Sequence, residues 1–172
     1  HTVTSGIVSA TGRSRVGIIG LGHVGRRVAA VSAVLGAEIG YTDHYVDTPA
    51  YERFDDVLSL ARWADVITVH LPHDDETHHT INAEVLEALG PDGVVVNTAR
   101  GGLVDEDALV HALEAGGIAG AALDVFEAEP YSGPLAGFPN VMLTCHMGSY
   151  ARQVRAAMEN EALRNAIDHI NE

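Results

Sequence analysis

The sequence predicts an α/β fold, in which one doubly wound parallel sheet is covered by helices on both faces. Three observations predict it: short apolar, β-branched segments recur along the chain, segments with helical periodicity separate them, and the connections are short. Repeated strand-helix-strand units of this kind give right-handed crossovers and a parallel sheet. Ligands bind such sheets beyond the carboxyl ends of the strands, so we expect the functional residues there. The expected strands are residues 16–19, 37–41, 66–69, 94–97, 118–123 and 141–144.

Helical segments lie between several of these strands. The first has its apolar residues at helical spacing, namely Val24, Val28, Val31 and Leu35. Gly36 is placed to end it, since glycine is favoured just after a helix. A second helix begins with acidic residues 105–107, which suit the positive end of the helix dipole. Leu109 and Leu113 share its buried face, and Gly116 follows its end.

The length of 172 residues suits a single domain. We expect residues 1–14 to be an N-terminal tail or linker remnant, and residues 15–172 to form the domain with its C-terminal helix. That helix should run from Tyr150 onward. Five apolar residues share one side of it and predict a packing role: Val154, Met158, Ala162, Ala166 and Ile170.

Composition and charge limit the classes of partner. A formal net charge of -14 repels nucleic acid and anionic membranes, so neither is an expected partner. No segment approaches the ~18 consecutive apolar residues that a membrane span needs, and residues 1–12 lack the pattern of a signal peptide. Cys145 is the only cysteine, so no internal disulfide can form. These features predict a soluble, cytoplasmic protein.

A glycine-rich segment, Gly20-Leu21-Gly22-His23-Val24-Gly25, joins the first expected strand to the first helix. In this context the first glycine permits a tight turn, the second lets the backbone approach a pyrophosphate, and the third packs helix against strand. Helix N-terminal amides then face the phosphates, and His23 could donate to them as well. On spacing alone the segment could be a simple turn. Its position between strand and helix predicts a Rossmann-type dinucleotide site.

Asp43 follows the second expected strand, 43 − 25 = 18 residues after the last glycine. An acid about 20 residues beyond the motif bonds the adenosine ribose hydroxyls in such folds. Its carboxylate would repel a 2′-phosphate, and the next residues, His44 and Tyr45, are neither Arg nor Lys. NAD is therefore expected rather than NADP. The alternative is an aspartate that only forms a turn.

Four later segments follow the glycine loop: His70-Leu71-Pro72 with Thr77, Thr80, Ile81 and Asn82, then residues 97–106, 123–130 and 139–149. These segments resemble the signature blocks of the D-isomer-specific 2-hydroxyacid dehydrogenases. Together with the glycine loop they match this family in order and at plausible spacing. The resemblance implies a Rossmann NAD-binding domain. It also implies hydride transfer between NAD(H) and a small D-2-hydroxy acid or 2-keto acid.

The resemblance assigns roles that this chemistry needs. His146 matches the acid/base, for which imidazole, with an ordinary pKa of about 6.5, is suited. Glu129 matches the carboxylate that orients the ring, and Arg100 the anchor that grips the substrate carboxylate. Asp124 matches the acceptor for the nicotinamide carboxamide. The resemblance further assigns to the cofactor site His70, Pro72, Thr77, Thr98, Ala99, Arg100, Asp124, His146 and Gly148.

Simpler interpretations exist for each of these residues. A single histidine, a glutamate beside a proline, or an arginine between alanine and glycine is usually a solvated residue or pairs with a nearby acid. Their joint order favours the catalytic interpretation. A metal site at His73, His78 and His79 is not expected, because their spacing is irregular and no HExxH-type helix is present. Solvated histidines are expected instead.

The chain departs from the family pattern in three ways. Cys145 stands where a Pro or Ala is usual, and Met147 replaces a common Ile, both modest apolar changes. The chain is also about half the family's usual length, so we expect the flavodoxin-like substrate domain to be largely absent. That domain would close over the nicotinamide and exclude water. The chain alone should therefore bind NAD(H) but turn over poorly.

Two further interpretations remain open. One is an NAD(H)-responsive protein-interaction module without turnover, as in corepressors that resemble these dehydrogenases. The other is an excised domain with no independent function. A homodimer is a possible assembly, since relatives commonly dimerise through this domain. The retained acid/base, carboxylate and anchor types favour an enzyme origin.

Overall fold

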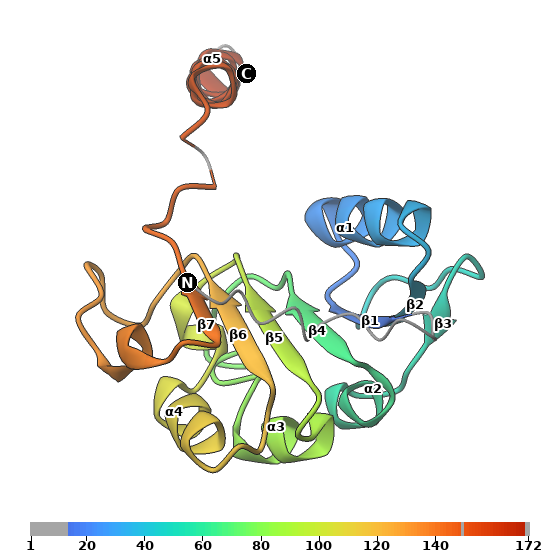
Figure 1. Cartoon of the computed structure of the whole chain (residues 1–172). Coiled ribbons are helices and arrows are strands. Elements are labelled where there is room, and N and C mark those ends of the chain that lie inside the picture. The colour runs from blue at the N-terminus through green and yellow to red at the C-terminus, as the bar shows by residue number, and fades with distance from the viewer. Residues whose placement is uncertain (1–13, 149, 171–172) are drawn as a thin grey trace.

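A computed structural model describes residues 14–148 and 150–170 of the chain. Its centre is one seven-stranded sheet in the order β3-β2-β1-β4-β5-β6-β7, and every neighbouring pair is parallel (Figure 1). Strand order reverses between β1 and β4, as in doubly wound nucleotide-binding folds. The strands are β1 (Arg15–Ile19), β2 (Glu38–Thr42), β3 (Glu52–Arg53), β4 (Val66–Val69), β5 (Val94–Asn97), β6 (Gly120–Leu123) and β7 (Val141–Leu143).

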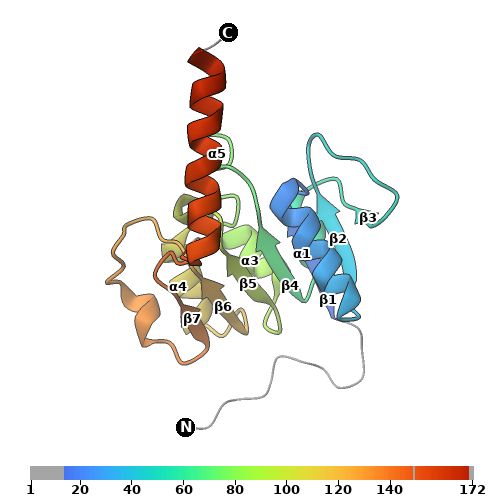
Figure 2. The same cartoon turned by 90° about the horizontal axis from the view of Figure 1, so that it is seen from above.

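Helices lie on both sides of this sheet. The α-helices are α1 (His23–Val34), α2 (Val57–Trp63), α3 (Ala83–Leu89), α4 (Glu106–Glu114) and α5 (Arg152–Ile170), and two 3₁₀ turns, η1 (Gly101–Leu103) and η2 (Pro134–Gly137), lie in the loops. Figure 1 shows α2, α3 and α4 side by side on one face, with α1 on the other. Figure 2, seen from above, shows α5 extending away from the sheet.

Side chains that alternate between the two faces of the sheet form two hydrophobic cores, one on each face. Ile18 and Ile19 are neighbours in β1 and both are fully or almost fully buried, yet they belong to different clusters. Ile18 packs with Ala29 of α1, whereas Ile19 belongs to the larger cluster under α2, α3 and α4. Successive side chains of a strand point to opposite faces, so a strand apolar at every position needs both faces covered. The expected α/β class is confirmed.

The expected strands agree with the observed ones, with small shifts at their ends. Residues 66–69 and 94–97 coincide with β4 and β5, while β6 begins only at Gly120. The sequence did not predict β3, α2 or α3, because β3 is two residues long and the two helices have seven residues each. Asp56 and Asn82 cap α2 and α3 by accepting from the backbone, a local signal that could have found them.

Helix α1 is confirmed, but its apolar positions are largely exposed. The side that meets the sheet is made of small residues, Gly25 and Ala29, with Val28 half-buried. Val24 and Val31 are 58% and 61% exposed. Close approach of helix to sheet explains the difference, because glycine and alanine let the backbones come together and valine would hold them apart.

Helix α5 is also present, and the packing expected of it is absent. No residue of α5 is buried, and Figure 1 shows the helix standing clear of the sheet. Its apolar side therefore faces solvent in this chain. Across residues 14–148 and 150–170, none of the helices has the length and apolar content to cross a membrane. Strand β1 begins at Arg15, and the expected tail falls almost wholly outside the described residues, so the expected domain bounds stay a prediction.

Two leucines test this division between core and solvent. Leu109 of α4 is fully buried, and Leu163 of α5 is 61% exposed. We expect Leu109→Ala to lower the free energy of unfolding by ~2–5 kcal/mol, the cost of a core cavity. Leu163→Ala, the matched control, should change it by less than ~0.5 kcal/mol. Urea denaturation measures both, and equal losses would contradict the described packing.

Candidate functional site

The glycine loop between β1 and α1 has the shape that its three glycines require. Gly20 has φ of +90°, and a Cβ there would lie 2.8 Å from Leu71 Cδ2. A Cβ on Gly25 would lie 2.1 Å from the carbonyl oxygen of Gly20, so that position also demands glycine. At Gly22, by contrast, nothing lies within 4 Å of a Cβ. The backbone at Gly22, where α1 begins, is therefore open to a ligand that approaches closely.

Asp43 lies just beyond β2, and its carboxylate joins the glycine loop to the loop after β2. Its Oδ2 accepts from the Leu21 amide at 2.7 Å, and its Oδ1 accepts from the Tyr45 and Val46 amides at 2.8 Å each. Partial burial disfavours the charged carboxylate, but these three amide bonds outweigh it and lower the pKa of Asp43. A carboxylate offers about four acceptor positions. One remains for a ligand hydroxyl.

A cavity of about 470 Å³ lies between the glycine loop and the loops that follow β4 and β5. Six of its lining residues were expected in the cofactor site, and Leu71 and His73 were not. The lining is Val24, His70, Leu71, Pro72, His73, Thr98, Ala99 and Arg100. The cavity brings together residues from α1 and two successive strand ends. This supports a shared ligand site at the sheet's carboxyl edge.

His70 and Arg100 give this cavity its polar character. His70 Nε2 and the hydroxyl of buried Thr68 are 3.1 Å apart, and burial lowers the pKa of His70. Arg100 is exposed and donates to the carbonyl oxygen of Ala99 at 2.6 Å. No carboxylate in the described part of the chain pairs with Arg100. Its guanidinium is thus available to an anion.

Asn97, fully buried at the end of β5, shapes the loop that carries Arg100. Its amide donates to the Arg100 carbonyl at 2.8 Å, and its side-chain oxygen accepts from the Ala99 amide at 3.0 Å. Gly101 then packs so tightly that a Cβ would lie 1.9 Å from the carbonyl carbon of Phe126. Sequence reasoning did not single out Asn97. A polar residue ending an otherwise apolar strand is the signal that could have found it.

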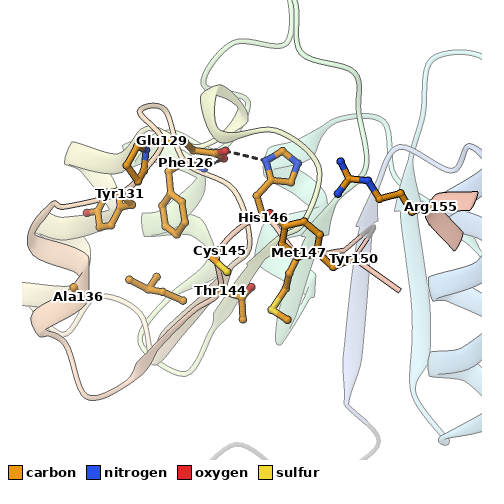
Figure 3. Close-up of a pocket in the computed structure, with 12 residues that line it drawn as sticks. Phe126, Glu129, Tyr131, Ala136, Thr144, Cys145, His146, Met147, Tyr150 and Arg155 are labelled. Atoms are coloured by element: carbon orange, nitrogen blue, oxygen red, sulfur yellow. Dashed lines mark hydrogen bonds and ion pairs between the residues drawn. The ribbon is translucent and has the colours of Figure 1, made fainter. Parts of the chain in front are cut away.

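The catalytic pair expected from the sequence is brought together from two loops, Glu129 from the one after β6 and His146 from the one after β7. His146 Nδ1 donates to Glu129 Oε2 at 2.9 Å, shown by the dashed line in Figure 3. Glu129 Oε1 also accepts from the Phe126 amide at 3.1 Å. These bonds, that from His146 first, lower the pKa of Glu129. With Nδ1 engaged, Nε2 of the imidazole is left to exchange a proton with a ligand.

Asp124, buried at the end of β6, holds the loop that carries His146. Its Oδ1 accepts from the Thr144 hydroxyl at 2.5 Å and from the Met147 amide at 2.9 Å. Its Oδ2 accepts from the Gly148 amide at 3.1 Å. Burial opposes the charge, but these bonds prevail and lower the pKa of Asp124. His146 itself has φ of +53°, a conformation unusual for a non-glycine residue, and the Asp124 bonds on both sides maintain it.

His146 and Glu129 line a second, larger cavity of about 900 Å³ (Figure 3). Phe126 and Tyr131, stacked with centroids 4.4 Å apart, form part of its apolar wall. The structure therefore places Arg100 and His146 at the same edge of the sheet, after β5 and β7, but in different cavities. A substrate that bridges them would have to lie between the two cavities.

Eight expected cofactor residues lie outside both cavity linings: Gly20, Gly22, Gly25, Asp43 and Asp124, described above, and also His23, Thr77 and Gly148. His23 is exposed at the first position of α1. The Thr77 hydroxyl donates to the Pro72 carbonyl at 2.8 Å and accepts from the Asp74 amide at 2.9 Å, which closes the turn after β4. Gly148 serves the Asp124 network. Contacts of all the expected residues with a cofactor stay predictions.

The histidines after β4 differ in part from the solvated residues expected there. His73 and His78 are exposed, but His79 is half-buried and bonded to Glu127. Among the described residues, no group of three or more His, Cys, Asp or Glu side chains is arranged to hold a metal ion.

Comparison with known proteins agrees with the observed fold. Residues 5–148 match the family model "D-isomer specific 2-hydroxyacid dehydrogenase, NAD binding domain". A 2-ketogluconate reductase of Gluconobacter oxydans is 36% identical over 162 residues, covering 93% of this chain and 52% of that protein. The glyoxylate/hydroxypyruvate reductase HPR3 of Arabidopsis thaliana is 46% identical over 134 residues, covering 77% and 42%. The chain spans about half the length of the curated relatives it matches.

Solved structures agree with this match. The NADPH-dependent glyoxylate/hydroxypyruvate reductase of Sinorhizobium meliloti, solved with NADP and malonate, aligns with a TM-score of 0.85 at 40% identity, covering 89% of this chain and 48% of that one. A D-isomer specific 2-hydroxyacid dehydrogenase from Lactobacillus delbrueckii, in its NAD complexed form, aligns at 0.81 with 29% identity, covering 92% and 53%. The resemblance inferred from the sequence is confirmed. The chain belongs to the D-isomer specific 2-hydroxyacid dehydrogenase family, of which it carries the NAD-binding domain.

Proposed function

We propose that this chain binds NAD(H) and forms the cofactor half of a dehydrogenase that interconverts a small D-2-hydroxy acid and its 2-keto acid. The observation that carries the proposal is the 2.9 Å bond between His146 and Glu129. That pair lies at the same sheet edge as the open backbone of Gly22 and the unpaired guanidinium of Arg100. An acid/base, a carboxylate anchor and a phosphate cradle are the parts that this reaction needs.

The residues present suit a dinucleotide. The diphosphate would lie against the backbone of Gly22, where the first amides of α1 lack intrahelical partners and carry the positive end of the helix dipole. The free acceptor position of Asp43 would take a hydroxyl of the adenosine ribose. The cavity that includes Val24, His70 and Pro72 would take the middle of the cofactor.

When bound, the nicotinamide ring of the cofactor supplies a hydride acceptor at its C4. Arg100 binds the substrate carboxylate, where its planar guanidinium can make two parallel hydrogen bonds. His146 Nε2 takes the hydroxyl proton while the C2–H bond delivers its electron pair as hydride, so the alcohol becomes a ketone by loss of two electrons and two hydrogens. Glu129 holds Nδ1 and stabilises the imidazolium that forms. In reduction, His146 returns the proton to the carbonyl oxygen.

The proposal includes a cytoplasmic location and, as an assembly, a homodimer. The single cysteine, which allows no internal disulfide, is consistent with the first. The exposed apolar residues of α1 and α5 are consistent with a covered surface in an assembly.

The open position at Gly22 gives a direct test of cofactor binding. We expect Gly22→Ala to fold normally, because nothing lies within 4 Å of the added methyl group. The methyl group would keep the diphosphate from the backbone, so NADH should bind about tenfold more weakly or worse, ~1.4 kcal/mol. Gly137→Ala, equally free of contacts but located in η2, is the matched control. Fluorescence titration measures both, and unchanged affinity for Gly22→Ala would disprove this placement.

Asp43 predicts the choice between NADH and NADPH. Its lowered pKa keeps it charged at neutral pH, where it would repel a 2′-phosphate. Two unit charges 4 Å apart in water cost ~1 kcal/mol, so NADH should bind about fivefold or more tightly than NADPH. Asp43→Asn should reduce that ratio, whereas Asp92→Asn, an exposed acid before β5, should not. Calorimetry of the six protein and cofactor pairs measures this, and a wild-type preference for NADPH would refute the prediction.

His146→Gln separates an enzyme from an NAD(H)-responsive interaction module. The chain should reduce glyoxylate slowly with NADH, because the exposed Arg100 competes with water for the carboxylate. Loss of the acid/base should slow this step by ~10²–10⁴-fold while NADH affinity is largely kept. Stopped-flow oxidation of NADH gives the rate. Equal rates with and without His146 would contradict the catalytic role, and NADH binding with no turnover in either protein would favour the interaction module.

A further inference from the structure

The three histidines after β4 form a connected group rather than separate solvated side chains. His73 Nε2 and His78 Nδ1 are joined by a hydrogen bond of 3.1 Å, and the rings of His78 and His79 stack with centroids 3.7 Å apart. His73 also lines the smaller cavity. A Cβ on Gly102 would lie 2.5 Å from His73 Nε2, so glycine there lets this ring lie against the backbone. The group extends from the cavity to the loops behind it.

His79 is the last of the three histidines and lies between two acidic side chains, Glu127 and Asp105. Its Nε2 lies 2.7 Å from Glu127 Oε1, and its Nδ1 lies 3.7 Å from Asp105 Oδ2. Its backbone N–H donates to the Gly102 carbonyl at 2.8 Å. The side chain is only 32% exposed, so water competes less for the bond to Glu127 than at an open surface. One residue thus contacts both the loop after β5 and the loop after β6.

These two loops carry the groups that the proposed reaction uses. Gly102 lies two residues after Arg100, and Glu127 lies two residues before Glu129. The loops also meet directly, because a Cβ on Gly101 would lie 2.4 Å from the Glu127 amide nitrogen. On the Glu127 side, the Glu127 amide donates to Glu106 Oε1 at 2.7 Å. The hydrogen bond between His79 and Glu127 adds a side-chain contact to the packing of these two loop backbones.

The spacing of the two loops matters for the chemistry. The carboxylate and the hydroxyl of a 2-hydroxy acid stand on adjacent carbons, so Arg100 and the His146–Glu129 pair must act within a few ångströms of each other. Catalytic groups lose efficiency when they stray by more than about 0.5 Å from the productive geometry. Arg100, on the loop after β5, lines the smaller cavity, and Glu129, on the loop after β6, lines the larger one, so the two loops that His79 contacts each line one of the cavities.

We propose that His79 is a positioning residue, which sets the spacing of Arg100 and Glu129 through its contacts with Gly102 and Glu127. This inference rests on the proposed function, because the spacing has a purpose only if both residues act on one substrate. His79 touches neither of them. Its effect passes through the turn from Phe126 to Glu129, whose first amide holds Glu129 Oε1.

The backbone of His79 offers a way to separate this role from a purely structural one. His79 has φ of +52°, a conformation that asparagine tolerates better than glutamine does. Glutamine, one methylene longer, carries an amide N–H to about the place of His79 Nε2, and asparagine does not. If backbone strain at residue 79 were the cause, His79→Asn would disturb the site less than His79→Gln. If the bond to Glu127 is the cause, His79→Gln disturbs the site less. The two explanations therefore rank the two variants in opposite orders.

The readout is the carboxyl carbon of Glu129, followed by ¹³C NMR as pH is varied. In the wild-type chain the pKa of Glu129 lies below its ordinary value because of the bonds from His146 and Phe126. We expect His79→Asn to loosen the turn and raise that pKa, and His79→Gln to return it to the wild-type value. Glu127→Ala should raise it like His79→Asn, and the double variant should add nothing further. His111→Asn, an exposed histidine of α4, is the control.

A wild-type titration of Glu129 in His79→Asn would overturn the inference. So would a larger shift in His79→Gln than in His79→Asn, because that order is the one expected from backbone strain alone. Failure of the proposed function would appear elsewhere, as a wild-type chain that takes up no NADH. The two failures are therefore distinguishable in the same set of proteins.

Discussion

The geometry of the site depends on one buried carboxylate, that of Asp124. It accepts from the Thr144 hydroxyl before His146 and from the amides of Met147 and Gly148 after it. A non-glycine residue at positive φ persists only where its surroundings over-determine it, and these bonds supply that constraint. The imidazole of His146 is thereby presented to Glu129. The contact between His146 and Glu129 thus depends on a side chain that the family resemblance assigns to the cofactor site.

The same arrangement recurs along the carboxyl edge of the sheet. Asp43 after β2 and Asp124 after β6 each accept from backbone amides of a neighbouring loop, and Asn97 at the end of β5 binds the backbone of its own loop. Parallel strands bring these loops to one edge, and the side chains then give each loop a fixed shape. Arg100 and His146 remain exposed at that edge, because Asn97 and Asp124 make the hydrogen bonds that hold their loops. The loops at this edge are thus held by hydrogen bonds, while the side chains that they carry stay accessible to a ligand.

Much of this fold is readable from the sequence, because buried parallel strands are apolar throughout and glycines mark the dinucleotide loop. The pairing of His146 with Glu129 came from family resemblance, since no local pattern links residues 17 positions apart. The exposed side of α1 and the unburied α5 could not be predicted, because periodicity shows that a helix has an apolar side but not what covers it. The hydrogen bond between His79 and Glu127, which are 48 residues apart, likewise forms only after folding and could not be predicted.

In the proposed complex a dinucleotide lies across this edge, with its diphosphate at the start of α1. Backbone amide NMR during titration with NADH locates the cofactor, because each loop reports separately. We expect saturable shifts at the amides of residues 20–25 and of Asp43, with smaller ones along the loop around His146. Saturation without change at residues 20–25, or no uptake by the folded chain, would contradict it.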